Sequence, residues 1–308
     1  MKIAFLGPEG TYTHQAVIQQ FGTFQLEISP KKSIDACFEA INAREVDFAI
    51  VPFENSTNGQ VVFTYDLLRD WFFDNDKDCH FRIVGEQFVS IHHNLLSNVP
   101  VDKIKTIYSH PQVWTQVKSF LKKLGPDVIK VDVGSTSQAA ELVSQSKEQN
   151  VAAISSSMSA KLYNLPIEEF GIEDKSDNTT RFLILGYSKP PEQILEKGAE
   201  KQENTESEKK GSTSYGRITS LMFTLPGDNP GALCDVLVKF KEHGINLVSI
   251  NSRPANMQAW QYVFFVESSE IEDPLILKDI ENSCLTLVNL GTFNRNWRYA
   301  TKLEDTRK

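Results

Sequence analysis

The sequence predicts an α/β protein in which two α/β lobes are followed by a smaller unit of βαββαβ order. First, residues 1 to about 186 alternate short apolar runs with amphipathic stretches, which is typical of strands followed by helices. Second, this periodicity disappears from 192 to 214. Third, the stretches from 219 onward follow the order strand, helix, strand, strand, helix, strand, which is typical of a ferredoxin-like domain.

The first lobe opens with an apolar run at 3–6 that ends in a Gly-Pro turn, as expected of a strand and the loop behind it. Two amphipathic helices follow, and Thr13 and Ser33 are their expected N-caps. A buried strand then leads into the polar loop 52–59. Because strands that alternate with helices form a mostly parallel sheet, polar loops at the strand ends are the expected site.

The second lobe is expected over roughly 78–175. Apolar runs predict further strands in this region, such as the one at 151–154. Pro111 suits a first helical turn, and one apolar stripe continues from there until Gly125, which predicts a single helix. We expect the strand at 182–185 to return to the first lobe.

A polar linker over 189–216 separates these lobes from the last domain. Its run of Lys, Glu, Ser and Thr cannot bury enough apolar surface to offset the entropy of ordering it. The predicted domains are therefore a two-lobed part at 1–188, the linker, and a final domain at 217–308. In that final domain, Asn229 is the expected cap of the first helix and Pro230 its first residue.

Composition narrows the range of functions. The 308 residues carry a formal net charge of -8, with 40% hydrophobic and 23% charged residues, as in soluble globular proteins. A negative charge of this size argues against nucleic acid or an anionic membrane as the main partner. The first apolar run is too short for a secretory signal, and the four cysteines lack pairing or metal-ligand spacing. We therefore expect a cytoplasmic protein without a metal site.

The stretch that carries chemistry is Asn178-Thr179-Thr180-Arg181, directly before the apolar run at 182–185. Polar clusters at the mouth of a buried strand are where α/β proteins bind ligands. The guanidinium of Arg181 suits a carboxylate, and the threonine hydroxyls suit a substrate hydroxyl. A structural ion pair is the alternative for Arg181.

The histidines have plainer interpretations. His14 and His110 are expected at the first turns of helices, where a structural hydrogen bond and a catalytic role are both open. We expect His92 and His93 on the surface. Because neighbours in a strand point to opposite faces, this pair does not have metal-binding spacing. No Ser-His-Asp or Cys-His arrangement is recognisable.

With these pieces placed, the chain resembles the prephenate dehydratase family with a carboxy-terminal ACT domain. Five motifs stand in family order, two more lie in the last domain, and the resemblance covers nearly all of the chain apart from the linker. The motifs are Gly7-Pro8-Glu9-Gly10-Thr11-Tyr12-Thr13-His14, Val51-Pro52-Phe53-Glu54-Asn55-Ser56 with Gly59, Ser109-His110-Pro111-Gln112 with Gln116, Ser135-Thr136 with Ala139-Ala140, Thr180-Arg181-Phe182, Pro230-Gly231-Ala232-Leu233 and Ser252-Arg253-Pro254.

This resemblance implies a fold like that of periplasmic binding proteins, with the active site between two lobes. It also implies a carbon-oxygen lyase that converts prephenate to phenylpyruvate in phenylalanine biosynthesis, with loss of water and carbon dioxide and with no metal or organic cofactor. Thr180 is then the hydrogen-bond donor next to the leaving hydroxyl. The other implied catalytic residues are Asn55, Ser109 and Gln116, the last two being expected on one helix face. The implied substrate-binding residues are Arg181, Ser56, Thr57, Glu54 and Thr11.

The ACT domain implies feedback regulation by phenylalanine bound between subunits, hence a homodimer or homotetramer. The residues that the resemblance assigns to this effector are Gly231, Ala232, Leu233, Asn251, Ser252, Arg253 and Pro254. Gly231 would let a ligand approach the start of a helix, where backbone donors favour a carboxylate. Asn251 stands where the family usually has Glu, so we expect contact with the amino group of phenylalanine to be altered.

Two other functions fit part of this pattern. An arogenate dehydratase would perform the same reaction on the amino-acid analogue, and the motifs do not distinguish the two substrates. A non-catalytic small-molecule binding module would keep the two lobes and the sensory ACT domain. The combination of Thr180, Asn55, Ser109 and Gln116 argues against that second alternative.

Overall fold

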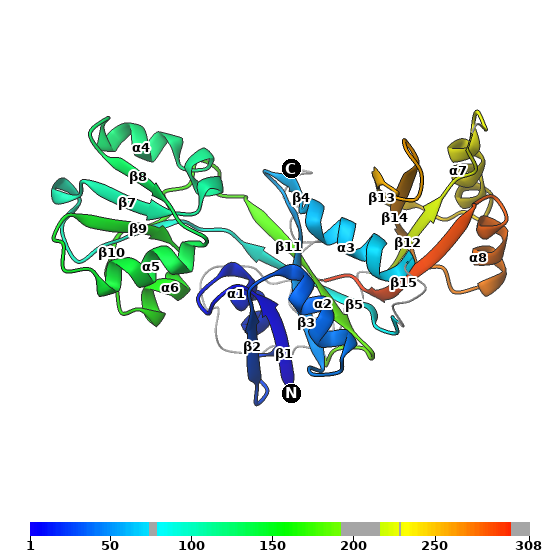
Figure 1. The fold of residues 1–308 in the computed structure, drawn as a ribbon, viewed down its shortest axis with the longest axis horizontal. Helices are drawn as coiled ribbons and strands as arrows, with labels where there is room; N and C mark the ends of the chain where they lie inside the picture. Colours follow the sequence, from blue (N-terminus) through cyan, green and yellow to red (C-terminus); the bar gives the residue numbers. More distant parts are fainter. Residues whose placement is uncertain (74–78, 192–215, 228, 297–308) are drawn as a thin grey trace, which may run out of the picture. The chain divides into compact units, whose positions relative to one another are not determined.

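The computed structural model describes residues 1–73, 79–191, 216–227 and 229–296 (Figure 1). Most of the expected linker, 192–215, therefore lies outside the described residues.

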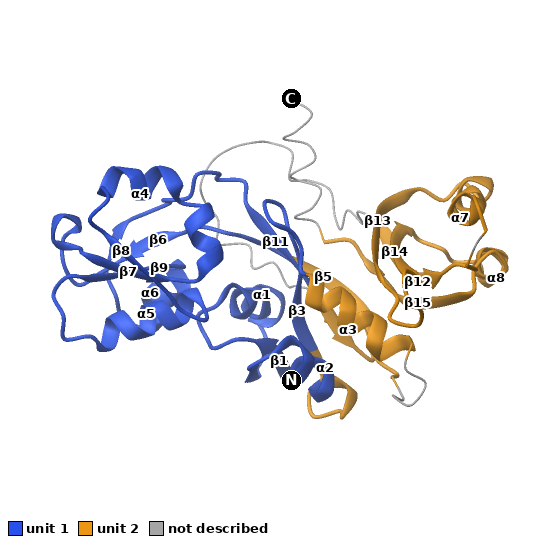
Figure 2. Ribbon diagram, turned by 45° about the horizontal axis from the view of Figure 1, so that its top comes forward, with its two compact units in different colours: residues 1–40, 49–61, 88–182 blue, residues 41–48, 62–87, 183–308 orange. Residues whose placement is uncertain are grey.

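The chain forms two compact units, and each unit consists of three separate segments of the sequence (Figure 2). The division passes through several elements of the amino-terminal region, and the whole carboxy-terminal part belongs to the second unit. The first unit comprises 1–40, 49–61 and 88–182, and the second comprises 41–48, 62–87 and 183–308.

A six-stranded sheet forms the first lobe, with the order β2-β1-β3-β11-β5 and with β4 paired to β3. As expected, the late strand returns to this sheet, because β11 lies between β3 and β5. Its strands are β1 (Lys2–Leu6), β2 (Glu27–Lys31), β3 (Phe48–Asn55), β4 (Gly59–Gln60), β5 (Arg82–Ser90) and β11 (Thr179–Gly186).

The structure confirms one of the two helix N-caps predicted in the first lobe. Ser33 caps α2 (Ile34–Asn42) by accepting a hydrogen bond from the Ala36 amide at 3.1 Å. Thr13, the expected cap of α1 (Tyr12–Phe21), lies inside that helix. Thr11 caps it instead, because its Oγ1 accepts from the His14 amide at 3.3 Å.

Helix α3 (Val62–Phe73) was not anticipated from the sequence. Its first four residues are Val62-Phe63-Thr64-Tyr65, and β-branched and aromatic residues have low intrinsic helix propensity. Packing decides the conformation here, since Tyr65 and Leu68 are fully buried.

A five-stranded sheet of order β10-β6-β9-β7-β8 forms the second lobe. It is mixed rather than mostly parallel, since β7 pairs in parallel with β8 and β9, whereas β6 is antiparallel to β9 and β10. This sheet spans 94–169, and β5 joins the first sheet, so the second lobe begins later than the expected residue 78. The strands are β6 (Asn94–Leu96), β7 (Thr106–Ser109), β8 (Ile129–Asp132), β9 (Val151–Ser155) and β10 (Ile167–Glu169).

Helices cover both faces of this second sheet (Figure 1). Alternate residues of β9 point to opposite faces: Ala152 and Ile154 pack in one apolar cluster with Phe120 of α4, and Val151 and Ala153 pack in another. The second cluster contains alanines and a valine of α5 and one alanine of α6. The helices are α4 (Lys118–Leu124), α5 (Thr136–Gln145) and α6 (Ser157–Leu162).

The single helix expected between Pro111 and Gly125 is interrupted. A 3-10 turn, η2 (Pro111–Thr115), ends before α4 begins at Lys118. Asp174 causes the break, because its carboxylate accepts from the amides of Lys118 and Ser119 at 2.7 and 2.9 Å and its own amide donates to the Gln116 carbonyl at 2.7 Å. Asp174 therefore caps α4 from a distant segment, and Ser109 and Gln116 do not share a helix face.

The loop between β1 and α1 is bonded to the helices of the second lobe. The Gly10 carbonyl accepts from the hydroxyls of Ser156 and Ser159 at 3.1 and 2.9 Å, and the Ser137 hydroxyl donates to the Glu9 carbonyl. Gly10 has φ +85°, a left-handed conformation that favours glycine. These bonds join the two lobes of the first unit at one short loop.

The carboxy-terminal part is the expected ferredoxin-like βαββαβ unit, with an antiparallel sheet of order β13-β14-β12-β15. With the two α/β lobes before it, this confirms the predicted fold class. The elements are β12 (Arg217–Thr224), α7 (Ala232–Glu242), β13 (Leu247–Pro254), β14 (Tyr262–Ser269), α8 (Pro274–Glu281) and β15 (Thr286–Asn294).

The start of α7 differs from the expectation. Asn229 and Pro230 precede the helix instead of capping and opening it, because the Ala232 amide donates to the Asn229 carbonyl at 3.1 Å and closes a turn there. Gly231, with φ +93°, takes the cap position, and its left-handed conformation turns the chain into the helix.

Both faces of this sheet are covered within the second unit. One face packs on α7 and α8 through a buried cluster that includes Phe223, Phe240 and Ile280. On the other face, the ring of Phe265 in β14 meets the ring of Tyr65 in α3 edge to face, with centroids 5.1 Å apart.

Across the described residues, no helix is both long and apolar enough to cross a membrane.

Replacement of Gly10 by alanine tests the junction between the lobes. A Cβ at this position would lie 2.5 Å from the Ser137 Oγ and 3.1 Å from the Ser159 Oγ, whereas a Cβ at Gly59, which also has positive φ, meets nothing within 4 Å. Both variants carry the left-handed strain of about 1 kcal/mol or more. We expect Gly10→Ala to lower the temperature of thermal unfolding clearly more than Gly59→Ala. Equal decreases in calorimetry would contradict the proposed junction.

Candidate active site

The start of β11 and the end of β3 form the centre of the candidate site. The Ser56 amide donates to the Thr179 carbonyl at 2.8 Å, and the Thr179 amide donates to the Ser56 Oγ at 2.9 Å. This pairing brings Asn55 next to Asn178 and Thr180, residues more than 120 positions away in the sequence. The residues of two predicted motifs therefore lie together.

The backbone fixes the orientation of the Asn55 side-chain amide. Its Oδ1 accepts from the amides of Thr57 and Asn58 at 3.0 and 2.8 Å. Since backbone amides only donate, this atom is the oxygen. The Asn55 Nδ2 then donates to the Asn178 Oδ1 at 2.8 Å and to the Thr180 Oγ1 at 3.0 Å.

This bond leaves the Thr180 hydroxyl proton available. The hydroxyl oxygen is an acceptor toward Asn55, so its own proton points elsewhere. Within the part of the chain that the structure describes, no side chain or carbonyl accepts that proton. Thr180, which is half-buried, can therefore donate a hydrogen bond to an oxygen of a bound ligand.

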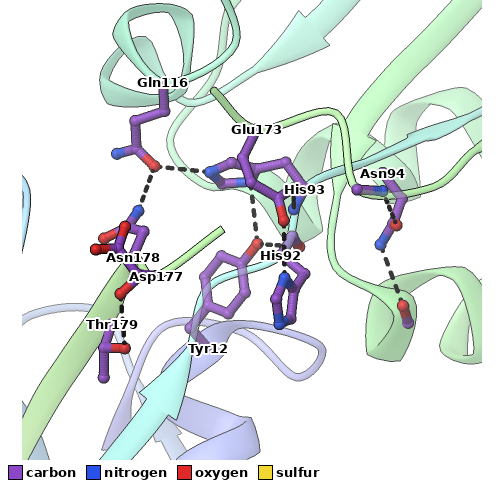
Figure 3. Close-up of polar contacts among 11 residues, drawn as sticks. Tyr12, His92, His93, Asn94, Gln116, Glu173, Asp177, Asn178 and Thr179 are labelled. Atoms are coloured by element: carbon purple, nitrogen blue, oxygen red, sulfur yellow. Dashed lines mark hydrogen bonds and ion pairs between the residues drawn. The ribbon is translucent and has the colours of Figure 1, made fainter. Parts of the chain in front are cut away.

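Hydrogen bonds continue from Asn178 toward the second lobe (Figure 3). The Asn178 Nδ2 donates to the Gln116 Oε1 at 2.9 Å, and the same oxygen lies 2.8 Å from the His93 Nε2. The His93 Nδ1 lies 3.0 Å from the Tyr12 hydroxyl, which also donates to the His92 carbonyl at 2.8 Å. We call this series of side chains, from Asn55 through Asn178, Gln116 and His93 to Tyr12, the amide chain.

The expectation that His93 is a surface residue is wrong, since only 1% of it is exposed. Burial lowers the pKa of the His93 imidazole, although the bond to Gln116 and the charge of Glu173 oppose this shift. Burial also raises the pKa of the Tyr12 hydroxyl. Both rings are therefore neutral at physiological pH.

Glu173 holds the segment that carries the two histidines. One carboxylate oxygen lies 2.7 Å from the His92 Nδ1, and the other accepts from the His93 amide at 2.9 Å. Burial of Glu173 raises its pKa, but the bonds from His92 and from the His93 amide outweigh this effect, so the pKa lies below its ordinary value. The group is an anion at neutral pH.

Arg181 is buried beside two aromatic rings. Its guanidinium carbon lies 5.3 Å from the ring centroid of Phe53 and 6.0 Å from that of Phe88, within cation-π range. These rings restrict the positions that the guanidinium can take.

The other expected site residues are spread around this centre. The Ser109 hydroxyl donates to the Ile154 carbonyl at 2.8 Å, so it serves the pairing of β7 and β9 and lies outside the amide chain. The Thr11 hydroxyl is also engaged locally, with Pro8 and His14. Glu54 pairs with Gln60 across β3 and β4, and Thr57 is exposed beside Asn55.

The expected effector residues lie on two elements of the ACT region. Gly231, Ala232 and Leu233 form the start of α7, whereas 251–254 form the second half of β13. Ala232 is buried and Leu233 packs against the apolar core.

The β13 segment is bonded to helix α3. The Asn251 Nδ2 donates to the Tyr65 hydroxyl at 3.0 Å, and the Arg253 guanidinium binds both carboxylate oxygens of Asp66 at 2.9 Å. The Arg69 guanidinium donates to the Pro254 carbonyl at 2.6 Å. Ser252 is exposed. The strand expected to bind an effector therefore also anchors a helix from the first 75 residues.

The arrangement favours a reaction in which negative charge develops on an oxygen. Thr180 offers a hydroxyl donor held by a neutral amide, and preorganised donors of this kind stabilise such charge. In the described part of the chain, His, Cys, Asp and Glu side chains form no group of three or more that could hold a metal ion.

Comparison with known proteins decides the family. The model of the prephenate dehydratase family matches residues 3–190, and that of the ACT domain matches residues 219–284. This chain belongs to the prephenate dehydratase family. The prephenate dehydratase match includes every member of the amide chain, and the ACT match includes both segments expected to bind the effector.

Two curated relatives match over nearly their whole length. A probable prephenate dehydratase from Saccharomyces cerevisiae is 36% identical, with 98% of each chain covered. The prephenate dehydratase of Methanocaldococcus jannaschii is 35% identical, with 92% of this chain and 94% of the relative covered.

A solved structure shares the fold. The prephenate dehydratase of Arthrobacter aurescens in complex with L-Phe has a TM-score of 0.77 and 26% sequence identity, and the match covers 95% of this chain and 90% of that chain.

Sequence motifs predicted Asn55, Gln116 and Thr180 as site residues, and the structure brings them together with His93, Tyr12 and Glu173, which were not predicted. Tyr12 lies inside one of the sequence motifs, and Glu173 lies five residues before Asn178. A usable signal was the position of His93 two residues before the apolar pair Leu95-Leu96, since a buried strand predicts buried neighbours.

Glu173→Gln tests the anchoring role of this carboxylate. Because the pKa of Glu173 is lower in the folded state, its contribution to stability is full above about pH 4.5 and is lost as the pH falls through the folded value. We expect the variant to unfold at a lower temperature than wild type at pH 7, with the difference shrinking below about pH 4.5. The exposed Glu168→Gln is the control, and a deficit for Glu173→Gln that does not change with pH would contradict the assignment.

Proposed function

We propose that this protein removes water and carbon dioxide from prephenate to form phenylpyruvate. The single observation that carries the proposal is the free donor at Thr180, whose hydroxyl oxygen is occupied by Asn55. Membership of the prephenate dehydratase family and two relatives that match over nearly their whole length support the same substrate.

The reaction needs a donor for one departing oxygen. As the bond between the ring and its carboxylate breaks, the electron pair enters the ring and expels the ring hydroxyl, while carbon dioxide leaves and the ring becomes aromatic. One proton from solvent completes the water molecule. A threonine hydroxyl is too weak an acid to ionise fully, so Thr180 acts by donating a hydrogen bond that stabilises the developing charge.

Neutral donors and one cation suit a substrate with two carboxylates. Gln116 offers its side-chain amino group, and Arg181 offers charge close to the same strand end. A further anion near the substrate would be repulsive, so Glu54 fits an orienting role better than proton transfer. In this proposal Ser56 and Thr57 contribute polar groups at the edge of the site, and Ser109 and Thr11 support its backbone.

Regulation is assigned to the carboxy-terminal region. In this proposal residues 1–188 carry the reaction, 189–216 connect, and 217–308 bind phenylalanine as a feedback inhibitor in a homodimer or homotetramer. The ACT match and the relative solved with L-Phe support this division.

Among the described residues, all four cysteines are free thiols, which suits a reducing cytosol.

Thr180→Val is the decisive variant for the reaction, because valine keeps the shape of threonine but lacks the hydroxyl. Loss of one preorganised donor of this kind costs roughly a hundredfold to a thousandfold in kcat. We expect that loss in phenylpyruvate formation from prephenate, and near wild-type turnover in the control Thr180→Ser. Undiminished turnover by Thr180→Val would contradict the role, and preferential turnover of arogenate would reassign the substrate.

Gly231→Val tests the effector site. A Cβ at Gly231 meets nothing within 4 Å, so a valine side chain would occupy the open space at the start of α7 where the effector is placed. Gly244→Val is a matched control, since that glycine lies at the other end of α7 and also has positive φ with open space. We expect titration calorimetry to show phenylalanine binding lost in Gly231→Val only. Binding retained by both variants would remove Gly231 from the site.

A further inference from the structure

Each hydrogen bond between the side-chain amides of the amide chain has a fixed donor and a fixed acceptor, and backbone amides at Asn55 determine this order. Two backbone amides fix the Asn55 Oδ1, so Asn55 must donate to Asn178 through its nitrogen. The Asn178 Oδ1 is then an acceptor, and the Asn178 nitrogen donates to the Gln116 Oε1. No amide in this series can rotate by 180° without bringing two donors or two acceptors together.

This order determines the proton position on His93. The Gln116 atom that faces His93 is an oxygen, so the His93 Nε2 must carry a proton and donate to it at 2.8 Å. Neutral His93 then has an unprotonated Nδ1, 3.0 Å from the Tyr12 hydroxyl, whose single proton is shared between this nitrogen and the His92 carbonyl 2.8 Å away. The opposite tautomer would place two acceptors face to face.

Two donors therefore hold one oxygen of Gln116. The Asn178 Nδ2 and the His93 Nε2 both donate to the Gln116 Oε1, and the Gln116 side-chain NH2 group points away from His93 (Figure 3). Within the described chain, that amino group has no hydrogen-bond acceptor. A donor held in this way is prepared for a carboxylate or hydroxyl of the substrate.

We propose that His93 is a positioning residue for this reaction, which orients Gln116 by donating from its Nε2 to the Gln116 Oε1. The inference rests on the proposed function for its kinetic consequence but not for the tautomer itself. His93 does not exchange a proton with the substrate in this role. The Nε2 proton is present in both the neutral and the charged imidazole, so the orientation of Gln116 does not change when His93 titrates.

Three substitutions at one position separate this role from simple packing. In His93→Gln the side-chain nitrogen reaches about the place of Nε2 and can still donate to Gln116. In His93→Asn the polar group reaches only about the place of Nδ1, and His93→Leu has no donor. Misplacement of a substrate-binding group costs roughly tenfold to a hundredfold. We expect kcat for prephenate to fall by that amount in the Asn and Leu variants and to stay within about threefold of wild type in the Gln variant.

The pH profile provides a readout that a structural role alone would not give. His93→Gln should keep the shape of the wild-type dependence of kcat/KM on pH, because the donor does not titrate. Loss of one limb of that profile would mean that His93 itself exchanges a proton, and would overturn the positioning role. Equal losses in all three folded variants, or no loss in any, would overturn it as well.

A measurement on the wild-type protein keeps the inference separate from the proposed reaction. Nitrogen NMR of the full-length protein labelled with 15N-histidine should show His93 as the Nε2-protonated tautomer at neutral pH. The Nδ1-protonated tautomer would overturn the inference whatever the substrate is. If the wild-type protein turns over neither prephenate nor arogenate, the proposed function fails while the tautomer result still stands.

Discussion

Two backbone amides that bind one side-chain oxygen determine the chemistry of this site. The turn after β3 presents the amides of Thr57 and Asn58 to the Asn55 Oδ1, and this contact leaves the Asn55 side-chain nitrogen to donate toward β11. The Thr180 hydroxyl oxygen and the Asn178 side-chain oxygen both accept a hydrogen bond from that nitrogen. A local turn motif therefore determines which atoms of a site built from distant segments donate and which accept.

The scaffold brings these atoms together by interrupting regular structure. Gln116 reaches the amide chain because it lies in the gap between η2 and α4, and Asp174 maintains that gap by capping α4. Asp174 and Glu173 are neighbours, and Glu173 holds the His93 amide. A single two-residue segment thus supports both Gln116 and His93, which lie on different elements.

The sequence was sufficient for the fold class, and its motifs pointed to several residues that the structure brings together in the candidate site. Strand and helix periodicity found the order of the elements, since burial of alternate or helically spaced residues is a local property. Asn55, Gln116 and Thr180 were found because they lie in recognisable motifs. His93 and Tyr12 were missed because their contact joins positions 81 apart, and a histidine pair has no periodicity that indicates burial.

Distant contacts also explain why the sequence did not predict helix α3 or the helix interruption at Gln116. In α3, packing overrides the weak helix propensity of the first residues, and at Gln116 a carboxylate more than 50 positions away ends one turn and starts another. In both cases the deciding partner is distant in sequence.

The bonds between α3 and β13 have a consequence for the order in which the chain folds during synthesis. Tyr65 and Asp66 find their partners Asn251 and Arg253 only 186 and 187 residues later. While the ribosome makes the intervening chain, the face of α3 that meets the ACT sheet has no cover, including the ring of Tyr65 that later packs on Phe265. The amino-terminal region therefore cannot complete its packing until the last domain has emerged, and a truncated chain would expose an aggregation-prone helix.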